Sequence, residues 1–172
     1  MEIIDWQSGN CLQKKNFPVQ ISKCSIPIFR GSLDDILRQA KTTRVDSIVA
    51  LKFDTEHHNQ IEQCTNYDNV YFCSPLKGVN LPLSKISIIS YNFMKVQNTV
   101  SITVQAENGS AAFVWIDSFE FEGTWSDNAF FLKNNERFTV YFSPKWNTII
   151  KDIYAFISSL QIRSIADTIL KI

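Results

Sequence analysis

The chain has 172 residues, of which 45% are hydrophobic and 20% charged, and its 17 basic and 17 acidic side chains give a net charge of zero. This composition excludes a disordered chain, and the neutrality argues against nucleic acid or an anionic membrane as partner, because both select basic surfaces. The aromatic share of 13% favours a β-rich fold. The first six residues lack the basic start and apolar run of a signal peptide, so the chain as written carries no targeting signal.

The N-terminal half shows few regular elements. The predicted ones are a helix over 32–40 and strands over 47–53 and 70–73. Ser32 is the expected N-cap of the helix, and acidic residues fill its first turn. Two strands do not close a sandwich, so we predict that residues 1–79 form a truncated β-sandwich that lacks its first strands.

All four cysteines, Cys11, Cys24, Cys64 and Cys73, lie in this half. No pair has the two-residue spacing of a zinc knuckle or a redox motif. Three interpretations remain open: four buried thiols, one disulfide such as Cys64–Cys73, and a metal site.

The C-terminal half alternates apolar and polar residues in short runs separated by turn signals. The predicted elements in chain order are strands over 86–91, 100–106, 112–116, 129–132 and 137–142, a helix over 149–158 and a strand over 160–165. Asn108-Gly109 is a strong turn signal, and residues 133–136 are predicted to be a short hairpin loop. Strands of this length and spacing without long helices are typical of an antiparallel sandwich.

Two sequence features suggest chemistry but are better explained as loops. His57-His58 lies in a polar stretch, and adjacent histidines are poorly placed to share one metal ion. Asn135-Glu136 resembles the acid/base dipeptide of glycosidases, but it lies in the predicted hairpin loop, where nothing nearby desolvates Glu136. We identify no catalytic residue, no cofactor-binding residue and no metal ligand, and we expect no cofactor.

Asp127-Asn128 is predicted to form the turn that starts the strand near Ala129, with Asp127 organising it through side-chain-to-backbone bonds. A metal or sugar ligand is the alternative role for this pair.

A set of large aromatic residues has two interpretations. One is a sugar-stacking surface, and the other is packing in the core and between domains, where large aromatic side chains bury most area. The set comprises Trp115, Trp125, Trp146, Phe119 and Phe121.

Several stretches, in order, resemble the C-terminal β-sandwich domains of animal β-mannosidase, a glycoside hydrolase family 2 enzyme. The matching stretches are 113–117, Gly123, 125–130, 137–144 and 164–167, with 71–77, Leu81 and 85–86 at the junction of the last two domains and Trp6 and 32–53 as weaker matches. Trp115, Asp117, Asp127 and Asn128 belong to these motifs as structural residues. Two positions depart from the family pattern: Trp125 stands where a smaller aromatic is expected, and Ala129 where glycine is expected.

The resemblance implies an all-β chain with two domains: the truncated β-sandwich with its short helix over 1–79, and a C-terminal immunoglobulin-like β-sandwich over 80–172. The family's catalytic (β/α)₈ barrel of ~250 residues does not fit in this chain, and no residue matches either catalytic Glu. The chain is therefore expected to be the non-catalytic C-terminal portion of a β-mannosidase, inactive alone.

The expected partners are the remaining domains of that glycosidase, with a glycan as a second candidate. The expected location is the lysosome, and the sequon at Asn108 is a candidate glycosylation site on an exposed turn. The alternative function is a stand-alone module that binds carbohydrate or protein.

Overall fold

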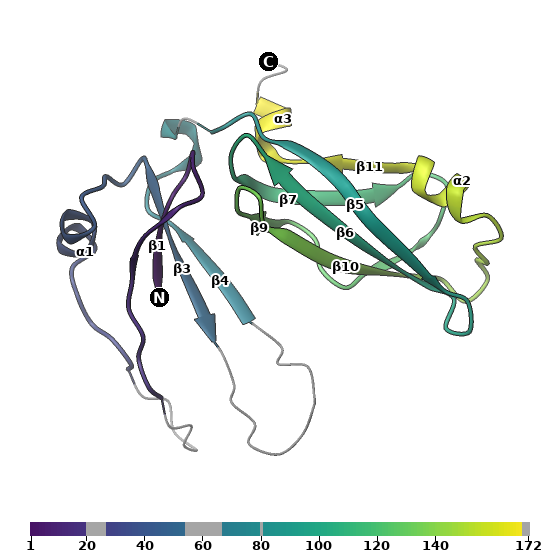
Figure 1. The fold of residues 1–172 in the computed structure, drawn as a ribbon, viewed down its shortest axis with the longest axis horizontal. Helices are drawn as coiled ribbons and strands as arrows, with labels where there is room; N and C mark the ends of the chain where they lie inside the picture. The colour runs from purple at the N-terminus through teal and green to yellow at the C-terminus, as the bar shows by residue number, and fades with distance from the viewer. Residues whose placement is uncertain (20–26, 54–66, 80, 170–172) are drawn as a thin grey trace. The chain divides into compact units, whose positions relative to one another are not determined.

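A computed structural model describes residues 1–19, 27–53, 67–79 and 81–169. The chain divides into two compact units, Met1–Leu81 and Pro82–Ile172, and each is described by itself (Figure 1). Among the described residues, no helix has the length and apolar character needed to cross a membrane. His57-His58, Cys24 and Cys64 lie outside the described residues.

The first unit contains one antiparallel sheet with the strand order β2-β1-β3-β4. Its elements are β1 (Glu2–Asp5), β2 (Cys11–Lys14), α1 (Leu33–Gln39), β3 (Ser47–Phe53), β4 (Tyr67–Phe72) and a short 3₁₀ helix, η1 (Leu76–Gly78). The helix and strands β3 and β4 lie where the sequence predicts them, whereas β1 and β2 were not predicted. Strand β1 is central because it pairs with both β2 and β3.

Helix α1 contributes to a small apolar core. Ile36 and Leu37 of α1 pack with Ile3 of β1, Val49 of β3 and Cys73. Ser32 is the N-cap of the helix, as predicted, although its side chain makes no capping hydrogen bond. The acidic residues of the first turn instead form exposed ion pairs, Asp34 with Arg44 (2.8 Å) and Asp35 with Arg38 (2.7 Å).

Two of the four cysteines fall within the described residues, and both are free thiols. Cys11 is exposed, and Cys73 is buried with 5% of its surface accessible. Burial raises the pKa of the Cys73 thiol, which keeps it protonated at neutral pH. The structure therefore favours a core thiol at Cys73 over the Cys64–Cys73 disulfide.

The second unit is a sandwich of two antiparallel sheets, with the orders β5-β6-β10-β8 and β11-β7-β9 (Figure 1). Its elements are β5 (Lys85–Met94), β6 (Thr99–Glu107), β7 (Ala111–Ser118), β8 (Gly123–Trp125), β9 (Phe130–Leu132), β10 (Arg137–Pro144), α2 (Ile153–Ser158), β11 (Leu160–Arg163) and α3 (Ile165–Ile169). The predicted all-β sandwich is confirmed.

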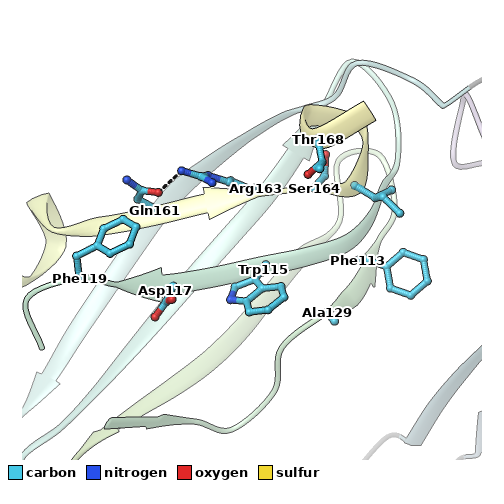
Figure 2. Close-up of a pocket in the computed structure, with 10 residues that line it drawn as sticks. Phe113, Trp115, Asp117, Phe119, Ala129, Gln161, Arg163, Ser164 and Thr168 are labelled. Atoms are coloured by element: carbon cyan, nitrogen blue, oxygen red, sulfur yellow. Dashed lines mark hydrogen bonds between the residues drawn. The ribbon is translucent and has the colours of Figure 1, made fainter. Parts of the chain in front are cut away.

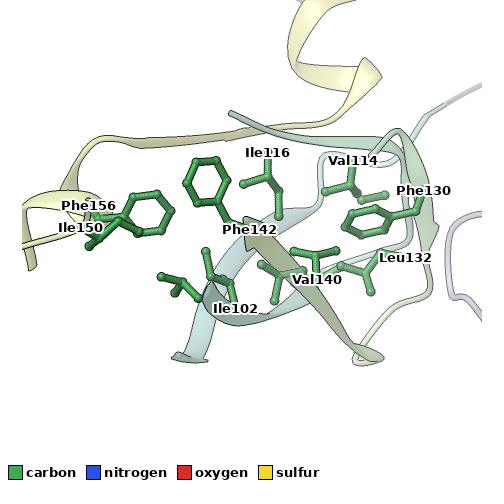
Figure 3. Close-up of a cluster of buried hydrophobic side chains, with 13 residues drawn as sticks. Ile102, Val114, Ile116, Phe130, Leu132, Val140, Phe142, Ile150 and Phe156 are labelled. Carbon is green, nitrogen blue, oxygen red and sulfur yellow. The ribbon is translucent and has the colours of Figure 1, made fainter. Parts of the chain in front are cut away.

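Alternation along the strands builds the core between the two sheets. In β6, every second side chain from Val100 to Ala106 is fully buried, and the side chains between them lie on the outer face. Val114 and Ile116 of β7 meet Phe142 of β10 from the opposite sheet (Figure 3). Because strand side chains alternate between faces, the same alternation sends the intervening residues of β7 to the outside.

Two connections of the second unit cross from one of its sheets to the other. The Asn108-Gly109 turn joins β6 to β7, and residues 133–136 join β9 to β10, but in each case the two strands belong to different sheets. The hairpin prediction for 133–136 was therefore wrong: this loop crosses from one sheet to the other. The two crossing loops are tied together, since the Gly109 N–H donates to Asn134 Oδ1 (3.1 Å) and the Asn135 N–H to the Ala106 carbonyl (2.7 Å).

Helix α2 is shorter than the predicted helix over 149–158. It begins after Asp152, whose carboxylate accepts a hydrogen bond from the Tyr154 N–H (2.8 Å). The last strand, β11, ends before Ser164, because Ser164 starts helix α3 and donates from both its N–H and its Oγ to Asp167 Oδ2 (2.7 and 3.0 Å). Ser164 and Asp167 have the Ser-x-x-Asp spacing of a capping box, a sequence pattern that marks the start of a helix.

Candidate functional site

The outer face of the three-stranded sheet carries a groove built on β7 and β11. Trp115 pairs with Arg163, and Asp117 pairs with Gln161, in an antiparallel register. Because Val114 and Ile116 point into the core, Trp115 and Asp117 point outward beside their β11 partners (Figure 2). We call this surface the aromatic groove; it is lined by Phe113, Trp115, Asp117, Phe119, Ala129, Gln161, Arg163, Ser164, Ile165 and Thr168.

The aromatic groove has a phenyl ring at each end and an indole between them (Figure 2). Phe113 lies in a bulge where the β7–β9 register shifts between Ala111 and Val114, and its φ of 51° is a conformation that bulky residues seldom adopt. Trp115 is 58% exposed and Phe119 is 72% exposed. The volume of the groove, about 550 Å³, is typical of small-molecule sites.

The polar side chains of the groove carry balanced charge. Among the described residues that line it, Asp117 and Arg163 are the only charged ones. Arg163 donates a hydrogen bond to Gln161, and Asp117 Oδ1 accepts one from the Ser118 N–H (2.8 Å). The groove thus offers an acceptor, a donor and an amide beside a half-exposed indole, without net charge.

The aromatic residues singled out in the sequence divide into two groups. Trp125 packs in the core against Phe142, with ring centroids 4.9 Å apart, and Phe121 packs edge-on against Phe156 at 5.3 Å. Trp115 and Phe119 instead line the groove, and Trp146, which is 95% exposed, does not. The packing interpretation thus holds for Trp125 and Phe121, whereas Trp115, Phe119 and Trp146 lie at the surface.

Asn128 and Asp127 form a structural turn beside the groove. The Ile116 N–H donates to Asn128 Oδ1, and Asn128 Nδ2 donates to the Ile116 carbonyl, both at 2.9 Å. Asp127 Oδ1 accepts one bond, from the Asn128 N–H (2.7 Å). The next residue, Ala129, has a φ of 61°, the left-handed conformation in which glycine is favoured.

Glu136 and Asn108 also have structural surroundings. Glu136 Oε2 accepts a hydrogen bond from the Lys133 N–H (3.1 Å), which closes the crossing loop. Asn108 is exposed at a φ of 65°, whereas Ser110 of its sequon is 1% exposed. Within the part of the chain that the structure describes, no group of three or more His, Cys, Asp or Glu side chains is arranged to hold a metal ion.

The sequence did not predict that Phe113, Gln161 and Arg163 line the aromatic groove. Residues 160–165 were predicted as a strand, but the sequence of that strand does not state which strand it pairs with. The pairing with β7 brings Gln161 and Arg163 to the groove.

Two packed antiparallel sheets with crossing connections define the second unit as an immunoglobulin-like sandwich. The family model Ig_mannosidase, an Ig-fold domain, matches residues 82–168, which is half of the chain. The chain belongs to this family of Ig-fold domains of mannosidase-type proteins. A search of curated proteins finds no match.

Proposed function

We propose that the chain is the non-catalytic C-terminal portion of a β-mannosidase, a lysosomal glycosidase that releases terminal β-linked mannose. The family match over 82–168 is the observation that supports this proposal most directly. Residues 113–117, 125–130 and 137–144 resemble animal β-mannosidase in the same order along the chain, and this resemblance supports β-mannosidase as the particular enzyme. The expected role is structural: the sandwich packs against the remaining domains of the enzyme, its partners.

If the chain is non-catalytic, it should lack the pair of carboxyl groups that a glycosidase uses. A retaining mechanism needs two carboxyl groups about 5–5.5 Å apart that face one substrate. Glu136, which the dipeptide pattern singles out, instead holds the Lys133 backbone. The purified chain should therefore not hydrolyse an aryl β-mannoside.

The test is to map the transcript upstream of the Met1 codon and express the protein it encodes. The proposal predicts an open frame that continues into a barrel-encoding region, and a product that hydrolyses an aryl β-mannoside. The same product truncated before residue 82 should lose solubility or activity. A transcript that starts at Met1 behind its own promoter would contradict the proposal and favour a stand-alone module.

Passage through the secretory pathway predicts one modification. Asn108 is exposed on a turn and begins an Asn-Gly-Ser sequon, so protein secreted from animal cells should carry a glycan there. Mass spectrometry before and after glycosidase treatment measures the occupancy. Asn108 unmodified in every molecule would count against the lysosomal route.

A further inference from the structure

Trp115 presents an exposed indole on the outer face of the three-stranded sheet. Trp115 is 58% exposed, although its neighbours along β7, Val114 and Ile116, are fully buried in the core. The backbone of Trp115 is held by the pairing of β7 with β11, so the indole stands on a rigid sheet. An aromatic ring presented in this way offers a flat apolar face beside a polar edge.

The polar side chains beside the indole fit a ligand with many hydroxyl groups. Arg163 lies directly opposite Trp115, and Gln161 lies opposite Asp117. Side chains opposite each other in antiparallel strands are about 4.5–5.5 Å apart at Cβ, which is within reach of one small ligand. Arg only donates, an ionised Asp only accepts and Gln does both, and a hydroxyl group can satisfy all three.

Charge narrows the class of ligand further. Asp117 and Arg163 cancel each other within the lining, and the chain as a whole has a net charge of zero. An anion or a cation would gain from one of these side chains and lose at the other. Trp and Arg are enriched in protein interfaces but Asp is depleted there, so Asp117 is the lining residue that favours a polar ligand over a protein surface.

We propose that the aromatic groove binds a neutral saccharide, with the apolar face of a pyranose ring on Trp115 and its hydroxyl groups on Asp117, Gln161 and Arg163. Phe113 and Phe119, at the two ends of the groove, flank the sugar unit (Figure 2). This function goes beyond the structural role proposed above, which does not need a ligand in the groove.

The test is a titration of the full chain with neutral disaccharides, observed in NMR spectra through the tryptophan indole N–H resonances and, in every variant, through the backbone N–H resonances of Asp117, Gln161 and Arg163. Mannobiose, cellobiose and chitobiose are the probes, each added to tens of millimolar. The expected result is a saturable shift of the Trp115 resonance by at least one of them. Trp115→Ala should weaken that binding by about tenfold or more, as the loss of a stacking platform does.

Trp146→Ala is the matched control, because Trp146 is more exposed than Trp115 and does not line the groove. It should bind as the wild type does, and both variants should keep the wild-type unfolding midpoint. No saturable shift with any probe, or binding that survives in Trp115→Ala, would overturn the proposal. A Trp115-dependent dimer in sedimentation experiments would also overturn it and assign the groove to contact between copies of the chain.

Discussion

Asn128 continues the β7–β9 ladder with its side chain. Val114 pairs with Phe130 through the backbone, and the same register places Asn128 opposite Ile116. There the Asn128 carboxamide accepts from the Ile116 N–H and donates to the Ile116 carbonyl, as a backbone neighbour would. The sequence predicts that Asp127 organises this turn, and in the structure the Asp127 side chain accepts one local hydrogen bond, from the Asn128 N–H.

Asn128→Ala should lower the free energy of unfolding of the second unit by about 1–3 kcal/mol, because it leaves the Ile116 N–H and carbonyl without these partners. Asp127→Ala is the control, with an expected loss of about 0.5–1 kcal/mol for one net hydrogen bond. Denaturant midpoints with unchanged m-values measure both. A larger loss in Asp127→Ala than in Asn128→Ala would show that the carboxylate, and not the amide, holds the turn.

Ala129 has a backbone conformation that its side chain disfavours. The left-handed region costs a non-glycine residue roughly 1–2 kcal/mol, and glycine loses about 0.5–1 kcal/mol more conformational entropy on folding. Ala129→Gly should therefore stabilise the second unit by up to about 1 kcal/mol. A rise in the denaturant midpoint is the expected result, and a fall would mean that the turn does not keep this conformation in solution.

Strand β8 is held against β10 by close packing at Gly123. Gly123 pairs with Pro144, and a Cβ built on it would lie 2.6 Å from the Ser143 carbonyl oxygen and would overlap Phe142 Cζ. A backbone oxygen cannot move away cheaply, and Phe142 is locked in the core at 1% exposure. Glycine is thus the residue that the space at position 123 allows.

Gly123→Ala should destabilise the second unit by about 1–3 kcal/mol, the usual cost of overpacking. Thr124→Ala on the same strand is the control, since Thr124 is exposed and its hydroxyl makes only a long bond of 3.5 Å to the Ser143 carbonyl. The comparison is made by thermal and denaturant unfolding. Equal midpoints for the two variants would mean that β8 can move away from β10 at little cost.

The elements differ in how much of them the sequence predicts. Strands β6 and β10 follow from their own alternation, because one face of each is buried, and β7 follows from its continuous apolar run over 112–116. Strand β1 has only four residues, and both Ile3 and Ile4 are buried on its two faces, so it shows no alternation. The groove depends on the pairing of β7 with β11 and on the bulge at Phe113, which arise from tertiary packing.

The two units differ in the size of the core that the described residues form. In the first unit one buried cluster comprises Ile3, Ile36, Leu37, Val49 and Cys73, and Ile4, Trp6, Ile48 and Ala50 are buried besides. In the second unit thirteen buried residues from both sheets, α2 and the segment before α2 pack together in one cluster. Because burial of apolar surface is the main favourable term in folding, the second unit should hold most of the stability of the chain.

We propose that the C-terminal segment folds on its own as an immunoglobulin-like sandwich, whereas the N-terminal segment is a truncated β-sandwich that does not. The most direct test expresses residues 80–172 and 1–79 separately and follows thermal unfolding by circular dichroism and calorimetry. We predict one cooperative unfolding transition for the monomeric segment 80–172 and no cooperative transition for the segment 1–79. Aggregation of 80–172 together with cooperative unfolding of monomeric 1–79 would contradict it.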